Sequence, residues 1–473
     1  MGNPKGFIEI ERKEGGYRPV NERIYDYGEV EQTLNETDRI DQASRCMDCG
    51  VPFCHWACPL GNKNPEWQDA VYRGKWDQAY DILSSTNSFP EFTGRVCPAL
   101  CEKSCVLAIN NESVTIRENE CSVVEHAFDL GFVNPRIPTS RTGKKVAVIG
   151  SGPSGLSAAD LLNQAGHTVT VFEQDDKVGG LLRYGIPDFK LNKTIIDRRI
   201  EVFEKEGILF RVNTKVGRDI SHEELLTEFD AICLACGAMI PRDLPAEGRD
   251  LEGIHFALDF LKQQNKVVQG ENVPKEERIV ATRKRVLVIG GGDTGSDCVG
   301  TSIRQKAASV TQIEILNEPT SQRTEDNPWP FWPNIKRTSS SHLEGCERRW
   351  DLCTKRFIGQ DGKVTGVEVV KVEWVNENSR MKMREVPGSN EVIPAELVLL
   401  SMGFISPIHE GLLDNLGVEY DQRGNVKSTN NSTNHTKVFA AGDMTNGATL
   451  VVRAIRSGRD AAIQIDKYLE TKE

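Results

Sequence analysis

Two glycine-rich loops limit the folds open to this chain more than any other feature of its sequence. Apolar residues 146–149 lead directly into GSGPSG at 150–155, and apolar residues 286–289 lead into GGGDTG at 290–295. Each loop has the GxGxxG pattern between an expected strand and an expected helix, where backbone amides approach a pyrophosphate closely. The sequence therefore predicts an α/β fold with two Rossmann-like dinucleotide-binding domains. The candidate binding residues are Gly150, Gly152, Pro153, Ser154 and Gly155 in the first loop and Gly290, Gly292, Asp293, Thr294 and Gly295 in the second.

An acidic residue follows the first loop where an adenosine ribose needs a hydrogen-bond acceptor. The strand expected over 167–172 ends at Glu173, 18 residues after Gly155. Strand, glycine loop, helix, strand and acid in this order are typical of a dinucleotide site. Glu173 is therefore a candidate ligand of the ribose hydroxyls.

A late segment indicates which dinucleotide the first loop binds. Strand-like residues 438–441 end at Gly442 and Asp443, and residues 450–466 then form an expected helix. In this the chain resembles flavoproteins with two dinucleotide domains, where such a Gly-Asp pair holds the ribityl chain of FAD. Gly180 and Leu181 similarly resemble the segment beside the isoalloxazine. The resemblance implies an FAD domain that is split in sequence by the second unit, although Asp443 could also cap a helix.

The second loop predicts a nicotinamide dinucleotide. The next expected strand, 310–315, carries Glu314 near its end. Related NADPH-using flavoproteins often have an Arg-Arg pair at this place, and here residues 315–316 are Ile and Leu. Charge for a 2′-phosphate would then have to come from Arg304, Lys306 or Arg323, so NADH and NADPH both remain open.

Cysteines gather near the N-terminus in a pattern typical of metal sites. Eight of the thirteen precede residue 122: Cys46, Cys49, Cys54, Cys58, Cys97, Cys101, Cys105 and Cys121. The run CxxCxxxxCxxxCP, followed by CPxxCxxxC, resembles ferredoxin-type ligation of iron–sulfur clusters. Seven thiolates give one complete site and three ligands of another, which leaves Glu120 or Cys121 as the eighth. Two structural zinc sites are the alternative, but a neighbouring flavin favours centres that carry electrons.

These features together predict the domain organisation. A helical iron–sulfur domain is expected over residues 1–140, because apolar residues recur at helical spacing between 64 and 84. The FAD domain is expected in two parts, 141–238 and 403–473, with the NAD(P) domain between them at 239–402. Within the latter, Asp361-Gly362 should turn a β-hairpin.

Charge and hydropathy exclude some partners. The 473 residues include 58 Lys and Arg against 69 Asp and Glu, a formal net charge of −11. An acidic chain is not expected to bind nucleic acid or an anionic membrane. Residues 1–17 contain no apolar segment of a signal peptide, and no apolar run approaches the roughly twenty residues of a membrane span. A cytoplasmic protein is expected.

Over nearly its whole length the chain resembles the small (β) subunits of glutamate synthase. The resemblance rests on the cysteine runs, both glycine loops, GGLLRYGIP at 179–187, AGD at 441–443, and NPWP at 327–330 with Trp332-Pro333. The iron–sulfur module is also similar to the N-terminal part of dihydropyrimidine dehydrogenase. That similarity implies two [4Fe–4S] clusters, one bound by Cys46, Cys49, Cys54 and Cys105 and the other by Cys58, Cys97, Cys101 and Glu120.

The resemblance implies an electron-input subunit that oxidises NAD(P)H, reduces FAD and passes electrons through the clusters to a large (α) subunit. That partner would make L-glutamate from L-glutamine and 2-oxoglutarate, because residue 2 is Gly and this chain lacks the N-terminal cysteine of a glutaminase. No side chain is expected to be catalytic. The alternatives are an NAD(P)H:ferredoxin transhydrogenase or dihydropyrimidine dehydrogenase electron-input subunit, a zinc-stabilised docking module, and a stand-alone amino-acid or thiol oxidoreductase.

Overall fold

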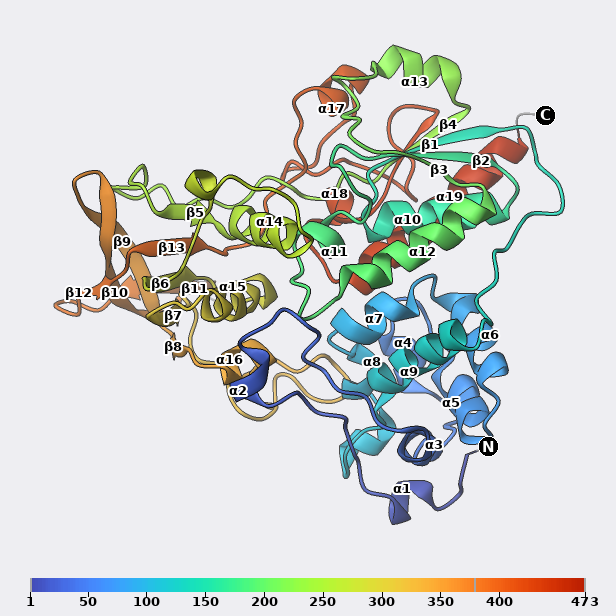
Figure 1. The fold of residues 1–473 in the computed structure, drawn as a ribbon, viewed down its shortest axis with the longest axis horizontal. Coiled ribbons are helices and arrows are strands. Elements are labelled where there is room, and N and C mark those ends of the chain that lie inside the picture. Colours follow the sequence, from blue (N-terminus) through green and yellow to red (C-terminus); the bar gives the residue numbers. More distant parts are fainter. Residues whose placement is uncertain (1, 378–379, 472–473) are drawn as a thin grey trace.

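The computed structural model describes residues 2–377 and 380–471 and consists of a helical N-terminal domain and three β-sheets (Figure 1). Two of the sheets are five-stranded and parallel, as the glycine loops predict. Within the described residues, no helix is both long and apolar enough to cross a membrane.

The first sheet has the strand order β14-β4-β1-β2-β3. Its strands are β1 Lys145–Ile149, β2 Thr168–Phe172, β3 Leu209–Arg211, β4 Ala231–Leu234 and β14 Val438–Ala440. The helices around it are α10 Pro153–Gln164, α11 Leu181–Tyr184, α12 Lys193–Glu206, α13 His222–Glu228, α17 Leu412–Leu416, α18 Asp443–Asn446 and α19 Val451–Glu470. Since β14 pairs with β4 from about 200 residues away, this domain is split in sequence.

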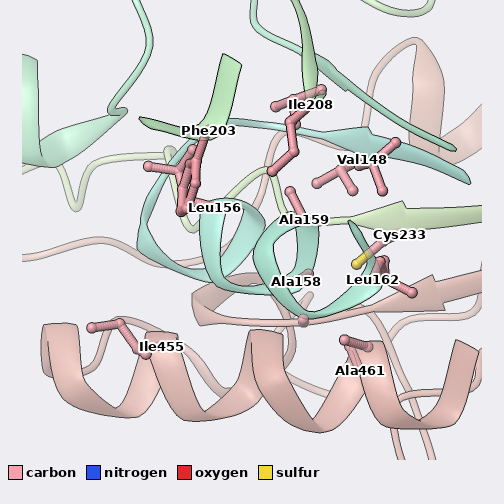
Figure 2. Close-up of a cluster of buried hydrophobic side chains, with 14 of the residues drawn as sticks. Val148, Leu156, Ala158, Ala159, Leu162, Phe203, Ile208, Cys233, Ile455 and Ala461 are labelled. Carbon is pink, nitrogen blue, oxygen red and sulfur yellow. The ribbon is translucent and has the colours of Figure 1, made fainter. Parts of the chain in front are cut away.

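Helices cover both faces of the first sheet, which explains its unbroken apolar strands. Val148 of β1 packs with Leu156 of α10 and Ile455 of α19, whereas its neighbour Ile149 belongs to the core on the opposite face. Figure 2 shows α10 lying between the sheet and α19. A Cβ at Gly458 would lie 2.0 Å from the Ser154 carbonyl, so only glycine permits this close helix contact.

The second sheet has the order β5-β13-β6-β7-β8 and repeats the parallel arrangement. Its strands are β5 Ile254–Phe256, β6 Arg285–Ile289, β7 Ser309–Ile313, β8 Glu347–Arg349 and β13 Leu397–Leu400. Its helices are α14 Ala257–Val268, the 3-10 helix Lys275–Glu277, α15 Asp293–Arg304 and α16 Ser340–Leu343.

A smaller antiparallel sheet completes this half of the molecule. It contains β9 Leu352–Gln360, β10 Lys363–Glu377, β11 Arg380–Glu385 and β12 Glu391–Pro394. Gln360 pairs with Lys363, which confirms the hairpin turned at Asp361-Gly362.

The N-terminal domain is helical, and it corrects one expectation. Its elements are α1 Gly6–Glu9, α2 Val20–Arg23, α3 Glu36–Ser44, α4 Phe53–Ala57, α5 Asn64–Tyr72, α6 Trp76–Thr86, α7 Pro90–Val96, α8 Leu100–Lys103, the 3-10 helix Val106–Ile109 and α9 Ile116–Asp129. The apolar periodicity over 64–84 suggests one helical stretch, whereas the structure has two helices. Gly74, with φ of +68°, ends α5 in the left-handed conformation that favours glycine.

Helix α7 holds the N-terminal domain on the first sheet. Phe89, which precedes α7, lies 5.8 Å from Phe203 of α12 between ring centroids. On the same two helices, Arg199 donates to Glu91 over 2.6 Å, and both side chains are almost completely buried. An aromatic contact and a buried ion pair therefore join the two domains.

Replacing one partner of this ion pair should destabilise the protein. Glu91→Ala leaves the buried Arg199 guanidinium without its carboxylate, a change that typically costs about 3–5 kcal/mol. We expect the thermal unfolding midpoint to fall by on the order of 10 °C. The control is Glu201→Ala, an exposed glutamate on the same helix as Arg199. Equal midpoints for the two variants in calorimetry would contradict this role of the pair.

Candidate functional site

The first glycine loop is shaped so that its backbone can contact a ligand. Gly150 has φ of +102°, and a Cβ there would lie 2.5 Å from the Ala235 carbonyl. A Cβ at Gly155 would lie 2.0 Å from the Gly150 carbonyl, whereas one at Gly152 would point into open space. Gly152 is also the N-cap of α10 and provides no side-chain cap. The first amides of α10 are therefore available to a pyrophosphate.

The structure places Glu173 against this loop. Its carboxylate accepts hydrogen bonds from the backbone amides of Ser151 at 3.1 Å and Asp175 at 2.9 Å, and from the Ser151 hydroxyl. Burial raises the pKa of Glu173. The carboxylate is thus held at the end of β2, where a ribose hydroxyl can donate to it.

Two further segments reach the first loop from distant parts of the sequence. A Cβ at Gly180 would lie 2.9 Å from Gly152 Cα, and one at Gly442 would lie 2.8 Å from Ser154 Cβ. Leu181 begins α11 directly after Gly180. The structure therefore brings together all three segments that the sequence assigns to a flavin dinucleotide.

Polar groups at this junction fit such a ligand. The Ser154 hydroxyl is buried without a hydrogen-bond partner among the described residues. Asp443 accepts from the Thr449 amide at 3.2 Å and hydroxyl at 2.7 Å, and burial raises its pKa. Asp443 stabilises the turn between the short α18 and α19, and Gly442 is the N-cap of α18.

The second glycine loop has the same geometry. Gly290 has φ of +120°, and a Cβ there would lie 2.1 Å from the Ser401 carbonyl. A Cβ at Gly295 would lie 2.4 Å from the Gly290 carbonyl, and one at Gly292 would meet open space. Gly292 is the uncapped N-cap of α15, with Asp293 and Thr294 in the first turn. This loop can hold a second pyrophosphate.

One charged group at the second loop, Glu314, lies at the end of the strand as expected, and a second, Arg348, was not expected. The Glu314 carboxylate lies directly against Gly291, where a Cβ would overlap it. Burial raises the pKa of Glu314, and Arg348, 3.8 Å away on β8, opposes that rise. The sequence does not predict Arg348 at this loop, because only the pairing of β8 with β7 brings it close to Glu314.

The three basic residues suggested for a 2′-phosphate are engaged elsewhere. Arg304 pairs with Glu344 in a buried contact, Lys306 donates to the Ile24 carbonyl, and Arg323 donates to the Lys103 carbonyl. A different basic residue, Lys190 from the segment between α11 and α12, forms an ion pair with Asp297 of α15. Sequence spacing gives no signal for this contact between the two dinucleotide domains.

Four of the predicted cluster ligands line one cavity in the N-terminal domain. They are Cys46, Cys49, Cys54 and Cys105. The cavity lining is mostly apolar and includes Phe53 and Val114. Burial raises the pKa of the Cys46 and Cys54 thiols to about 12, so a bound cation would be needed to keep them as thiolates. We call this group the outer site.

The other four candidates form a second group, the inner site. Cys58, Cys97, Cys101 and Glu120 interact electrostatically with one another. Glu120 is buried and accepts hydrogen bonds from the Asn87 amide at 3.0 Å and the Thr93 hydroxyl. Burial raises its pKa to about 7.

Cys121, the alternative eighth ligand, faces a different part of the domain. It packs against Gly94, and its strongest charge interactions are with Arg95 and Glu125 rather than with the cysteines. Adjacent helix positions differ by about 100° in direction. The helix α9 therefore presents Glu120, and not Cys121, to the inner site.

The two sites lie at different depths relative to the first sheet. Cys58 and Cys97 of the inner site pack against the core of that sheet, whereas the outer-site residues Cys46, Cys54 and Cys105 pack on the separate core of the helical domain, as does Cys101 of the inner site. Arg456 near the start of α19 donates to the Pro59 carbonyl over 3.3 Å. The inner site is thus the one next to the candidate flavin site. In the described part of the chain, no three His, Cys, Asp or Glu side chains converge as closely as a single metal ion requires.

Two family models match different parts of the chain. The family model for dihydropyrimidine dehydrogenase domain II, a 4Fe–4S cluster domain, matches residues 23–131. The model for pyridine nucleotide-disulphide oxidoreductases matches residues 144–458, which is more than half of the chain. The solved structure of a His57Gln mutant of FprA from Mycobacterium tuberculosis covers 70% of this chain and 85% of its own, with a TM-score of 0.57 and 20% identity. That likeness shows the fold.

Curated relatives match along almost the entire chain. The glutamate synthase [NADPH] small chain of Mycobacterium tuberculosis is 48% identical over 99% of this chain and 96% of its own length. Glutamate synthase [NADH] of Saccharomyces cerevisiae is 43% identical over 98% of this chain, but the match covers only 22% of that longer protein.

The orientation of α9 leads to a test of the eighth ligand. If each cysteine site holds one [4Fe–4S] cluster, Glu120→Ala should lose the cluster at the inner site and so about half of the bound iron and sulfide, because each such cluster needs four ligands. Cys121→Ala, the matched control one residue away, should retain both clusters. Iron and acid-labile sulfide per flavin are the measurements. Loss of iron from Cys121→Ala alone would overturn the assignment of Glu120.

Proposed function

The chain belongs to the family of glutamate synthase small chains, and from this we propose that it is the electron-input subunit of a glutamate synthase. It is an oxidoreductase with an iron–sulfur domain and a flavin- and nicotinamide-binding fold. The observation that carries the proposal is the contact of the inner cysteine site with the core beneath the first glycine loop.

In this proposal the chain's own residues position three kinds of redox group. The loop of residues 290–295 holds the pyrophosphate of NAD(P)H, and residues 150–155 with Glu173 and Asp443 hold FAD. When bound, FAD accepts a hydride from the nicotinamide and releases electrons singly, and [4Fe–4S] clusters carry single electrons. We propose no catalytic side chain in this transfer.

We further propose two clusters and an order for them. Cys58, Cys97, Cys101 and Glu120 would bind the cluster nearer FAD, and the four outer cysteines would bind the cluster farther from it. The packing of the inner site on the first sheet supports this order. The outer cluster would then deliver electrons to the partner.

The proposed partner is a large subunit that makes L-glutamate from L-glutamine and 2-oxoglutarate. In Saccharomyces cerevisiae the matching region is about a fifth of a single glutamate synthase chain, which supports a much larger companion for the present chain. The cysteines of this chain are all unpaired, which fits a reducing compartment, and we propose the cytoplasm.

We propose NADH or NADPH as the electron donor and do not choose between them. The Glu314 carboxylate could accept a hydrogen bond from the ribose 2′-hydroxyl of NADH, and Arg348 beside it could pair with the 2′-phosphate of NADPH. Relatives named for either nucleotide match this chain.

Partner identity tests the proposal directly. Anaerobic affinity purification of the chain from its native cells, followed by mass spectrometry, should recover a much larger flavoprotein with a glutaminase domain. A small ferredoxin-type or pyrimidine-reducing partner would instead support one of the alternative electron-input subunits. Zinc in place of iron and sulfide in the purified protein would contradict the electron relay.

Loss of one outer ligand should separate flavin reduction from glutamate synthesis. Cys49→Ser should leave the rate of FAD reduction by NAD(P)H unchanged, because the glycine loops are untouched. The rate of glutamate formation with the large subunit should fall by more than the roughly 10–100-fold that is typical when a residue hydrogen-bonded to a metal ligand is lost. Stopped-flow absorbance and a coupled assay measure the two steps. Cys353→Ser on β9 is the control, and undiminished glutamate formation by Cys49→Ser would refute the relay.

A further inference from the structure

A loop from the second dinucleotide domain reaches the outer cysteine site. We call residues 323–333, between β7 and α16, the aromatic loop. The Trp329 ring lies 4.7 Å from Phe53, and the Phe331 ring lies 5.9 Å from Trp56, measured between centroids. Both partners belong to α4, the helix that carries Cys54. In Figure 1 the chain next to α16 extends toward the helical domain.

The aromatic loop is also hydrogen-bonded to the end of α8, next to Cys105. The Ser104 hydroxyl donates to the Pro330 carbonyl over 2.6 Å, and Arg323 donates to the Lys103 carbonyl over 3.0 Å. Lys103 ends α8, and Ser104 immediately precedes the outer-site residue Cys105. The aromatic loop therefore contacts a residue adjacent in sequence to Cys54 and one adjacent to Cys105.

Internal hydrogen bonds hold the loop in this shape. Asn327 donates to the Trp332 carbonyl over 3.0 Å and accepts from the Asn334 amide at 2.8 Å. Arg323 donates to the Phe331 carbonyl over 2.6 Å. These three internal bonds hold the loop in one shape against α4 and α8.

Trp329 is the part of the loop that lies behind the cavity wall. Phe53 lines the cavity together with the outer cysteines, and Trp329 packs on Phe53. The Trp329 indole nitrogen is buried and has no hydrogen-bond partner in the part of the chain that the structure describes. Trp56 and Phe331, by contrast, are 60% and 54% exposed. Trp329 thus covers the side of Phe53 that faces away from the cysteines, and Phe53 also contacts the exposed Trp56 edge-on at 6.2 Å.

We propose that the aromatic loop is the cover of the outer site, and that Trp329 acts as a positioning residue that sets the reduction potential of the cluster held there. This inference rests on the proposed function. Reduction adds a negative charge to the cluster, and nearby water stabilises that charge. A cover that excludes water therefore lowers the potential, and solvent exposure is one of the known determinants of cluster potentials.

The test compares three variants of the complete protein. Trp329→Ala opens the cover. Trp329→Phe keeps an aromatic ring against Phe53. Trp332→Ala is the matched control, because Trp332 belongs to the same loop but packs on Arg337, 4.1 Å from its ring. The readouts are an EPR-monitored redox titration and the rate at which oxygen bleaches the cluster absorbance.

We expect Trp329→Ala to raise the reduction potential of one cluster. Oxygen should bleach the cluster absorbance of this variant severalfold faster than that of the wild type. The other cluster and the rate of FAD reduction should not change. Trp332→Ala should match the wild type in both readouts, and Trp329→Phe should restore most of the difference. Equal potentials and bleaching rates for Trp329→Ala and Trp332→Ala would overturn the cover.

If Trp329→Ala fails to assemble its clusters, a second variant tests whether the loop sets the cluster potential. Arg323→Ala removes the loop's hydrogen bond to the Lys103 carbonyl but leaves the Ser104–Pro330 bond and the Phe53 contact in place, so it should raise the potential of the same cluster by a smaller amount. No shift in this variant would overturn the proposal. A wild-type protein that lacks iron and sulfide would refute the electron relay as well, whereas two intact clusters with unaltered potentials in both variants would refute the cover alone.

Discussion

The buried junction between α7 and α12 is the contact on which the rest of the structure depends. It combines the Phe89–Phe203 packing with the Arg199–Glu91 ion pair, both of them inside the protein. The Arg198–Glu125 ion pair and the hydrogen bonds from Arg456 to the Pro59 carbonyl and from Arg459 to Ser88 also join the two domains, but these contacts are less buried. Because the inner cysteine site lies on this junction, its separation from the candidate flavin site is fixed by a hydrophobic core rather than by flexible segments.

Local sequence patterns predicted much of the fold and most of the candidate site, because the relevant forces act over short stretches. Gly150, Gly155, Gly290 and Gly295 face carbonyl groups at distances that exclude any Cβ, so the glycine spacing in the sequence predicts the geometry of both loops directly. The apolar strands, the Asp361-Gly362 hairpin and the acid after β2 follow from similarly local rules. Gly74 was the misleading case, since apolar periodicity continues across a residue that ends the helix.

Features that depend on contacts between distant segments could not be predicted in this way. Whether Glu120 or Cys121 faces the inner site depends on how α9 packs on α7, which spacing does not reveal. Arg348 reaches Glu314 only because β8 pairs with β7. The contact of Lys190 with Asp297 and the position of Trp329 each join different domains. The aromatic loop was recognisable as a motif, but the surface that it meets was not.

The split of the first sheet has a consequence for how the protein is made. Strand β14 and helix α19 complete a domain whose other strands end at Leu234, about 200 residues earlier. At typical synthesis rates the ribosome needs roughly 10–40 s to produce the missing part. Throughout that interval the face of α10 that later meets α19 has no partner. Chaperones have the opportunity to bind this nascent face, and flavin loading has to wait until Gly442 has emerged, because that residue closes on Ser154 of the first loop.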